Sequence, residues 1–177
     1  EVRAGTLRTG TSFTGTASLN SASFMNQEVR ESSPGFSGWV GLYNTSIFNI
    51  NNLIYQVEKA DYLTAADKSY YLGQAYGIRA YYYFYLFRTY GRVPLATEPK
   101  VLTSNPKSAA DMYLARTKTE KETLDFIKAD IDKSATNFSG NYTTKFQKAQ
   151  WSLAATQMLK AEVYLWSAKV KIDGNAP

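Results

Sequence analysis

Acidic side chains are the main groups in this chain that could transfer protons or bind a metal, because it has no histidine and no cysteine. Most hydrolase and transferase mechanisms use a histidine or a cysteine, so this chain lacks a residue that they need. Paired carboxylates would suit glycoside hydrolysis, but such pairs assemble in three dimensions and leave no sequence spacing. We predict no catalytic residue, no metal site and no cofactor. The acids considered are Asp61, Asp67, Glu120, Glu122, Asp125, Asp130, Asp132 and Glu162.

Most charged residues have a structural interpretation. Asp125, Asp130 and Asp132 are expected on the solvated face of a helix. Glu162 lies in an otherwise apolar helix, so it is either a buried acid with a raised pKa or, as we favour, the partner of a Lys or Arg on a neighbouring helix. Arg79 could anchor a ligand, but a structural hydrogen bond to a loop or a helix end is favoured.

Ligand binding is better supported than catalysis. Sugars are held by flat aromatic faces, with amide side chains that reach the hydroxyls. Aromatic and amide residues of this kind occur at or before the first predicted helix, and the alternative is that they plug the end of a helix stack. The candidate ligand-binding residues are Phe13, Phe24, Asn26, Gln27, Phe36 and Trp39.

The first half of the chain predicts an irregular segment followed by a helix pair. Residues 1–38 are rich in Thr, Ser, Gly and Asn, which is typical of loops. Apolar residues at helical spacing predict a helix over 38–59, and the pair spans 39–92. Thr64 is the expected N-cap of the second helix, with Asp67 as the acidic half of a capping box. Gly91 and Pro94 end that helix.

The second helix is crowded with aromatic residues. One stripe contains Ala80, Tyr83 and Phe84, and a neighbouring stripe contains Tyr81, Tyr82 and Tyr85. A helix with two apolar stripes must pack against neighbouring elements on at least two sides, as in stacked helix pairs. Arg79 and Arg88 interrupt the apolar run well before the roughly 18 residues that a bilayer would need.

A second helix pair is predicted over 117–170, after an inserted, proline-containing loop over 93–116. Thr119 and Glu122 form a capping box for the third helix, a turn is expected over 137–145, and the last helix spans 148–169. A faint repeat relates Ile78–Phe84 to Leu159–Leu165, as expected for helices buried between two neighbours. The predicted fold is all-α, with tetratricopeptide-like helical hairpins in an α-α superhelix.

The stretch over 74–99 resembles the aromatic helix of SusD/RagB-type proteins. The resemblance rests on Arg79-Ala80, the four aromatics that follow, and Gly91 with Val93-Pro94-Leu95. The helices expected over 39–59, 119–135 and 154–166 resemble other helices of the family in the same order. The resemblance therefore covers about 39–169 and implies a SusD-like fold.

The resemblance also implies a function. Members are lipid-anchored, non-catalytic nutrient-binding proteins, exposed at the surface of the outer membrane in Bacteroidetes. They bind oligosaccharide, or peptide in RagB-like members, and deliver it to a SusC-like TonB-dependent transporter. Family proteins are much longer, so this chain is expected to be a piece that lacks the lipid anchor, with 171–177 starting a following segment.

Two other classes remain open. One is a free-standing tetratricopeptide-type adaptor that binds a protein or peptide, and the other is an accessory domain of a polysaccharide-degrading enzyme. Nucleic acid is not an expected partner, because the net charge of +5 is mild and the 20 basic residues form no cluster.

Overall fold

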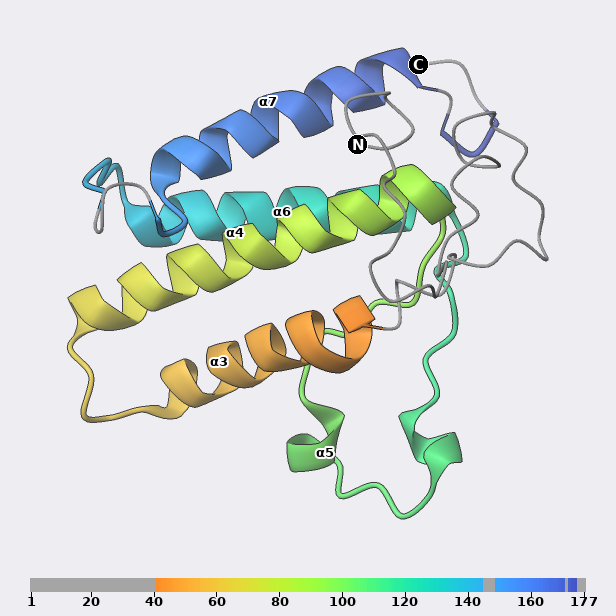
Figure 1. Ribbon diagram of the computed structural model, residues 1–177, viewed down its shortest axis with the longest axis horizontal. Coiled ribbons are helices and arrows are strands. Elements are labelled where there is room, and N and C mark those ends of the chain that lie inside the picture. Colours follow the sequence, from red (N-terminus) through yellow and green to blue (C-terminus); the bar gives the residue numbers. More distant parts are fainter. Residues whose placement is uncertain (1–40, 145–148, 171, 175–177) are drawn as a thin grey trace, which may run out of the picture. The chain divides into compact units, whose positions relative to one another are not determined.

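The computed structural model describes residues 41–144, 149–170 and 172–174. The chain divides into two compact units, Glu1–Gly41 and Leu42–Pro177, and the second is described here. The described residues form helices and no β-strand, although Pro94 and Arg116 pair in an isolated bridge, and this confirms the predicted helical class (Figure 1). In chain order the elements are the π-helix η2 (Leu42–Ile47), α3 (Phe48–Lys59), α4 (Ala65–Tyr90), α5 (Lys100–Thr103), the 3-10 helix η3 (Ala109–Met112), α6 (Glu120–Phe138) and α7 (Leu153–Lys169).

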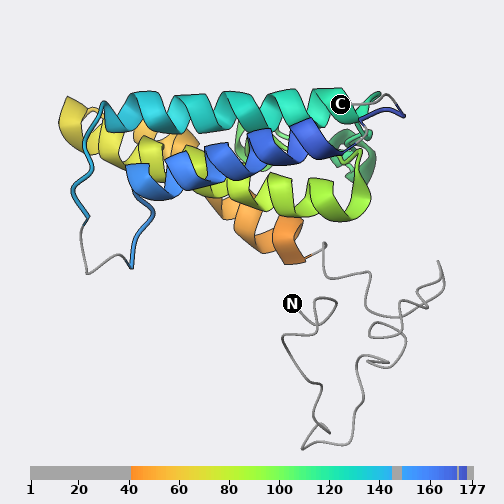
Figure 2. The ribbon, with the colours of Figure 1, turned by 90° about the horizontal axis from the view of Figure 1, so that it is seen from above.

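Helix α4 lies at the centre of this unit. It packs most extensively against α6, and it also contacts η2, α3 and α7, while α7 lies along both α4 and α6 (Figure 2). Ala80, Tyr83 and Phe84 are completely buried as a result. The prediction that the aromatic helix is covered on more than one side is confirmed.

The core joins the aromatic residues of α4 to aliphatic residues of α6 and α7. The Tyr83 ring meets Phe126 edge-on at a centroid distance of 5.0 Å, and Phe84 meets Trp166 in the same way at 6.0 Å. Full burial of an apolar side chain such as Phe84 contributes about 1.5–3 kcal/mol relative to leaving it exposed. The buried aliphatic partners are Leu124, Ile127, Ile131, Leu159 and Val163.

Helix ends follow the predicted caps closely. The Thr64 hydroxyl accepts from the backbone N–H of Asp67, and the Thr119 hydroxyl accepts from that of Glu122, each at 3.1 Å. Gly91 ends α4 with a φ of 65°, a backbone conformation that favours glycine. The hydroxyl caps of both long helices are therefore confirmed. The acidic half of each capping box bonds differently from the prediction, because Glu122 accepts from the N–H of Lys118 at 2.8 Å and Asp67 accepts from the Thr64 hydroxyl at 2.7 Å.

Two boundaries differ from the predictions. Helix α6 continues to Phe138, two residues into the expected turn region, because the Phe138 ring is buried against Tyr70 and Gly73 of α4. Helix α7 begins at Leu153 rather than 148, since the Ser152 hydroxyl accepts from the N–H of Ala155 and caps the helix there.

The outer face of α7 also differs from the prediction. We expected α7 to be apolar and buried between two neighbours, as its repeat with α4 indicated. Among the described elements it contacts α4 and α6, so its remaining face is open and Met158 and Leu165 are 75% and 64% exposed. The sequence repeat between α4 and α7 therefore reflects similar core-facing residues, although the two helices are not equally buried.

A buried ion pair joins α4 to α6. Arg79 and Asp130 are 3% and 1% exposed, and the guanidinium donates two hydrogen bonds to the carboxylate, from Nε at 2.6 Å and from Nη2 at 2.9 Å. Asp130 therefore does not lie on the solvated face where we expected it, whereas Asp125 and Asp132 do. None of the helices in the described ranges has the length and apolar character needed to cross a bilayer.

Replacing Asp130 with alanine is expected to lower the free energy of unfolding by roughly 3–5 kcal/mol, because it leaves the Arg79 guanidinium buried and uncompensated. Urea denaturation followed by circular dichroism measures this. The matched control is Asp125→Ala on the same helix, where the exposed pair with Lys121 is expected to contribute less than about 0.5 kcal/mol. Equal losses in the two variants would contradict the structural role of Asp130.

Candidate functional site

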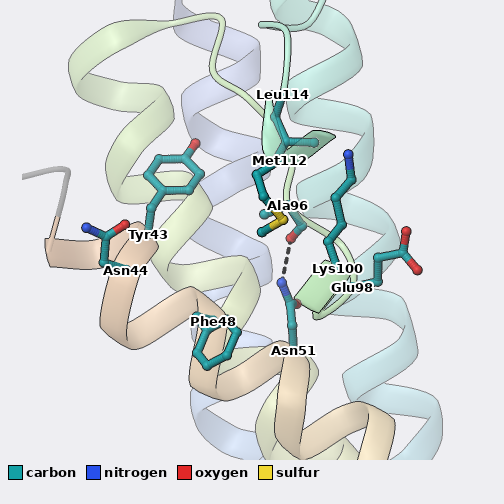
Figure 3. Close-up of a pocket in the computed structure, with 9 residues that line it drawn as sticks. All are labelled: Tyr43, Asn44, Phe48, Asn51, Ala96, Glu98, Lys100, Met112 and Leu114. Carbon is teal, nitrogen blue, oxygen red and sulfur yellow. Dashed lines mark hydrogen bonds between the residues drawn. The ribbon is translucent and has the colours of Figure 1, made fainter. Parts of the chain in front are cut away.

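The six ligand-binding residues proposed from the sequence, Phe13, Phe24, Asn26, Gln27, Phe36 and Trp39, lie outside the described residues. The described part of the chain instead brings together another group of aromatic and amide side chains. They line an open pocket of about 450 Å³ between the start of the first helical region and the loop that follows α4 (Figure 3). The lining residues are Tyr43, Asn44, Phe48, Asn51, Ala96, Glu98, Lys100, Met112 and Leu114.

One wall of the pocket comes from η2 and α3. Tyr43 and Asn44 lie in the π-helical turn, and Phe48 is the first residue of α3 (Figure 3). A π-helical turn is rare and is frequently found at functional sites. This wall therefore presents an amide and an aromatic ring one turn apart.

The other wall comes from the loop between α4 and α6. Ala96, Met112 and Leu114 add apolar surface, while Glu98 and Lys100 bring opposite charges. The Phe48 and Met112 side chains are each 37% exposed, so their apolar surfaces are open to a ligand. Apolar walls with a few polar groups are typical of small-molecule sites.

Side chains from three helical segments hold the start of this loop. The Tyr43 hydroxyl donates to the Pro94 carbonyl at 2.6 Å, and Asn51 Nδ2 donates to the Ala96 carbonyl at 2.9 Å. The Tyr83 hydroxyl donates to the Ala96 carbonyl at 3.0 Å and accepts from its N–H at 2.7 Å. The loop wall therefore has a defined position.

Arg79 connects this loop to the buried ion pair. Its Nη1 group donates to the Asn51 side-chain oxygen at 2.8 Å and to the Thr97 carbonyl at 3.1 Å. Burial alone lowers the pKa of Arg79, but the hydrogen bond and the charge of Asp130 outweigh it, so the pKa is raised. The structural interpretation of Arg79 is confirmed, and the loop it was expected to bind is the one that lines the pocket.

Glu162 also has the favoured structural role. Its carboxylate accepts from Arg88 of α4 at 2.9 Å, and both side chains are partly exposed. The alternative of a deeply buried acid is wrong, because Glu162 lies at the edge of the contact between α4 and α7. The described residues contain no cluster of three acidic side chains that could hold a metal ion.

A second pocket, of about 500 Å³, lies where α4 begins and α6 ends. Small and polar residues line most of it, including Ser69, Thr136, Asn137 and Asn141. The Tyr70 hydroxyl donates to Gln150 at 2.6 Å, so that phenol is already engaged. The first pocket has the better combination of exposed apolar walls and polar groups.

The sequence reasoning missed Asn44, Phe48 and Met112. One signal was present, because Phe48 falls outside the apolar stripe that contains Ile47, Ile50 and Ile54, and an aromatic off the core face with an amide four residues earlier indicates a surface site. Met112 had no such signal, since it reaches the pocket only through the path of the loop.

Ionisation of Tyr83 is expected to make the protein less stable at alkaline pH. Burial raises its pKa well above the usual value near 10, so the folded state keeps the phenol proton at a pH where the unfolded chain loses it. This contribution to stability is complete below pH 10 and declines above it by about 1.4 kcal/mol per pH unit. Unfolding free energies from urea titrations at pH 8, 10 and 11 measure the decline. Tyr83→Phe is expected to be less stable at pH 8 but to decline less steeply, and an unchanged slope would contradict this assignment.

Comparison with known proteins gives a consistent result over most of the chain. A SusD-like family model described as "Starch-binding associating with outer membrane" matches residues 6–165. A curated relative, SusD-like protein P38 from Formosa agariphila, is 32% identical over 148 residues, which cover 80% of this chain and 25% of that protein.

Solved structures show the same similarity. NanU from B. fragilis is 38% identical with a TM-score of 0.67, and the match covers 81% of this chain and 26% of that protein. A SusD superfamily protein from Bacteroides vulgatus is 33% identical with a TM-score of 0.71, covering 90% and 30%. A laminarin-binding SusD-like protein is 22% identical with a TM-score of 0.74 and shares the fold. The match covers 95% of this chain and 34% of that protein.

This chain therefore spans between a quarter and about a third of the length of these relatives. The likeness in structure confirms the predicted tetratricopeptide-like helical architecture. Since the family model covers most of the sequence and two solved structures agree at more than 30% identity, the chain belongs to the SusD-like family, whose members are described as starch-binding and associated with the outer membrane.

Proposed function

We propose that this chain is the helical part of a non-catalytic protein that binds oligosaccharide at the outer surface of the outer membrane. The observation that carries the proposal is the family match over residues 6–165. The name of one structural relative, a laminarin-binding SusD-like protein, supports a glycan as the ligand class. The exposed Phe48 ring and the Asn44 amide in the pocket are side chains of the types that sugars require.

The proposed partner is a SusC-like TonB-dependent transporter that receives the glycan. In this proposal the helices around α4 form a rigid platform, because their core is tied together by a buried ion pair and by aromatic contacts. Loops at one end of the platform hold the ligand. Attachment to the membrane would come from a lipid anchor.

The ligand contacts that we propose fall in two groups. The first group is the pocket beside η2, which the structure describes. The second group is the six residues predicted from the sequence, which precede the described residues. The proposed organisation keeps two helix pairs, 39–92 and 117–170, joined by the insertion over 93–116.

Isothermal titration of the chain with a panel of oligosaccharides and short peptides tests the ligand class. We expect at least one oligosaccharide to bind and the peptides not to bind, because hydroxyl-rich ligands match the amide and aromatic groups of the site. The control is a variant with Phe48→Ala, Phe24→Ala and Trp39→Ala combined, in which saccharide binding should be lost. Binding of peptides alone would favour the RagB-like alternative.

Co-purification from membranes of the source organism tests the partner. We expect a barrel transporter of the TonB-dependent class to be retained by the tagged chain. The tagged Asp130→Ala variant, in which the platform is destabilised, is the control for a contact that needs the folded helices. Recovery of a soluble protein partner in place of a barrel would instead support the adaptor alternative.

A further inference from the structure

We infer that the pocket between η2, α3 and the loop after α4 is a subsite for one neutral sugar ring of the oligosaccharide. Phe48 contacts the C–H face of that ring, and Asn44 binds its hydroxyl groups. This inference rests on the proposed function, because it takes the ligand to be a glycan.

The size of the pocket suits such a ligand. Its volume of about 450 Å³ lies at the lower end of the roughly 300–1,000 Å³ found for small-molecule sites. The pocket is also open, so a ring within it can continue into a longer chain. One ring of an oligosaccharide therefore fits without the rest of the ligand having to enter.

The apolar walls offer a ring and a thioether. Phe48 stands on α3, while Met112 and Leu114 come from the segment that forms the opposite wall of the pocket (Figure 3). The face of an aromatic ring carries negative potential, which attracts the weakly positive C–H groups on one face of a pyranose. Phe48 is part of α3, so its ring is presented from a regular helix and not from a free loop.

The polar groups are open for hydrogen bonding. The Asn44 side chain is exposed and makes no hydrogen bond with any of the described residues, so both its donor and its acceptor are available. Glu98 and Lys100 line the same pocket and take part in none of the salt bridges in the described part of the chain. Their opposite charges leave the pocket with no net charge, which favours a neutral hydroxylated ligand over an ionic one.

The same loop argues against a peptide that binds by strand addition. Such peptides need free backbone N–H and C=O groups along an edge. Here the N–H of Ala96 donates to Tyr83, and the carbonyls of Pro94, Ala96 and Thr97 accept from Tyr43, Asn51, Tyr83 and Arg79. These backbone groups of residues 94–97 are already engaged, so this part of the wall offers a ligand mainly its side chains.

Those hydrogen bonds also fix the pocket before the ligand arrives. Asn51 uses its amide nitrogen on the loop and its oxygen on Arg79, which is itself held by Asp130. A preformed site loses less conformational entropy on binding. Binding of a single ring therefore costs less entropy at this site than it would at a flexible one.

The methionine methyl groups provide a direct test by NMR. Met112 lines the pocket, whereas Met158 lies on the open face of α7 and serves as an internal reference. The probes are α-1,4- and β-1,3-linked glucohexaose, with a neutral hexapeptide as the comparison ligand. We expect a saturable shift of the Met112 methyl signal, assigned with Met112→Leu, and no shift for Met158.

Matched variants test the assigned contacts. Phe48→Ala and Asn44→Ala are each expected to weaken saccharide binding by roughly tenfold, the factor that corresponds to about 1.4 kcal/mol. Phe48→Tyr should bind as the parent does, and so should Tyr62→Ala, which removes an aromatic that is 87% exposed and lies outside the pocket. Unchanged circular dichroism and thermal midpoints in Phe48→Ala exclude unfolding as the cause.

The outcomes separate the two proposals. Saccharide binding that leaves Met112 unshifted, or that is unchanged in Phe48→Ala, would overturn the subsite and leave the proposed function standing. A Met112 shift caused by the hexapeptide alone would overturn the assigned ligand class. If no saccharide binds by calorimetry or by NMR, the proposed function fails for this chain and the subsite fails with it.

Discussion

The buried guanidinium of Arg79 is the constraint on which the rest of this structure depends. A charge that is 3% exposed must be compensated, and here a carboxylate, a side-chain amide and a backbone carbonyl together accept four hydrogen bonds from it. These partners come from α6, α3 and the loop after α4. One side chain therefore fixes the relative positions of three segments that are distant in the sequence.

The fold and the candidate site are connected through this network. Asn51 and Tyr83 belong to the buried interior, yet both hydrogen-bond the loop that forms a wall of the pocket. A change in the core is therefore expected to alter the shape of the site. The exposed Phe48 and Asn44 carry no such structural role, and this leaves them available for a ligand.

Charge was the feature most easily misjudged from sequence. Asp125, Asp130 and Asp132 share a short stretch of α6, but only Asp130 faces α4 and is buried. Helical spacing places residues on faces, and it does not say which face meets an arginine of another helix. The same limit applies to Asn51, a polar residue of α3 that is buried beside Arg79.

Local interactions made much of the fold readable from the residues. Apolar stripes, the caps at Thr64 and Thr119 and the glycine at the end of α4 depend on neighbours within one or two turns, so sequence was sufficient for the helices and for the family. The last turn of α6 could not be read in this way, because packing of Phe138 on α4 retains it. The pocket could not be read either, since it joins residues 43–51 to residues 96–114 through hydrogen bonds that exist only once the helices have packed.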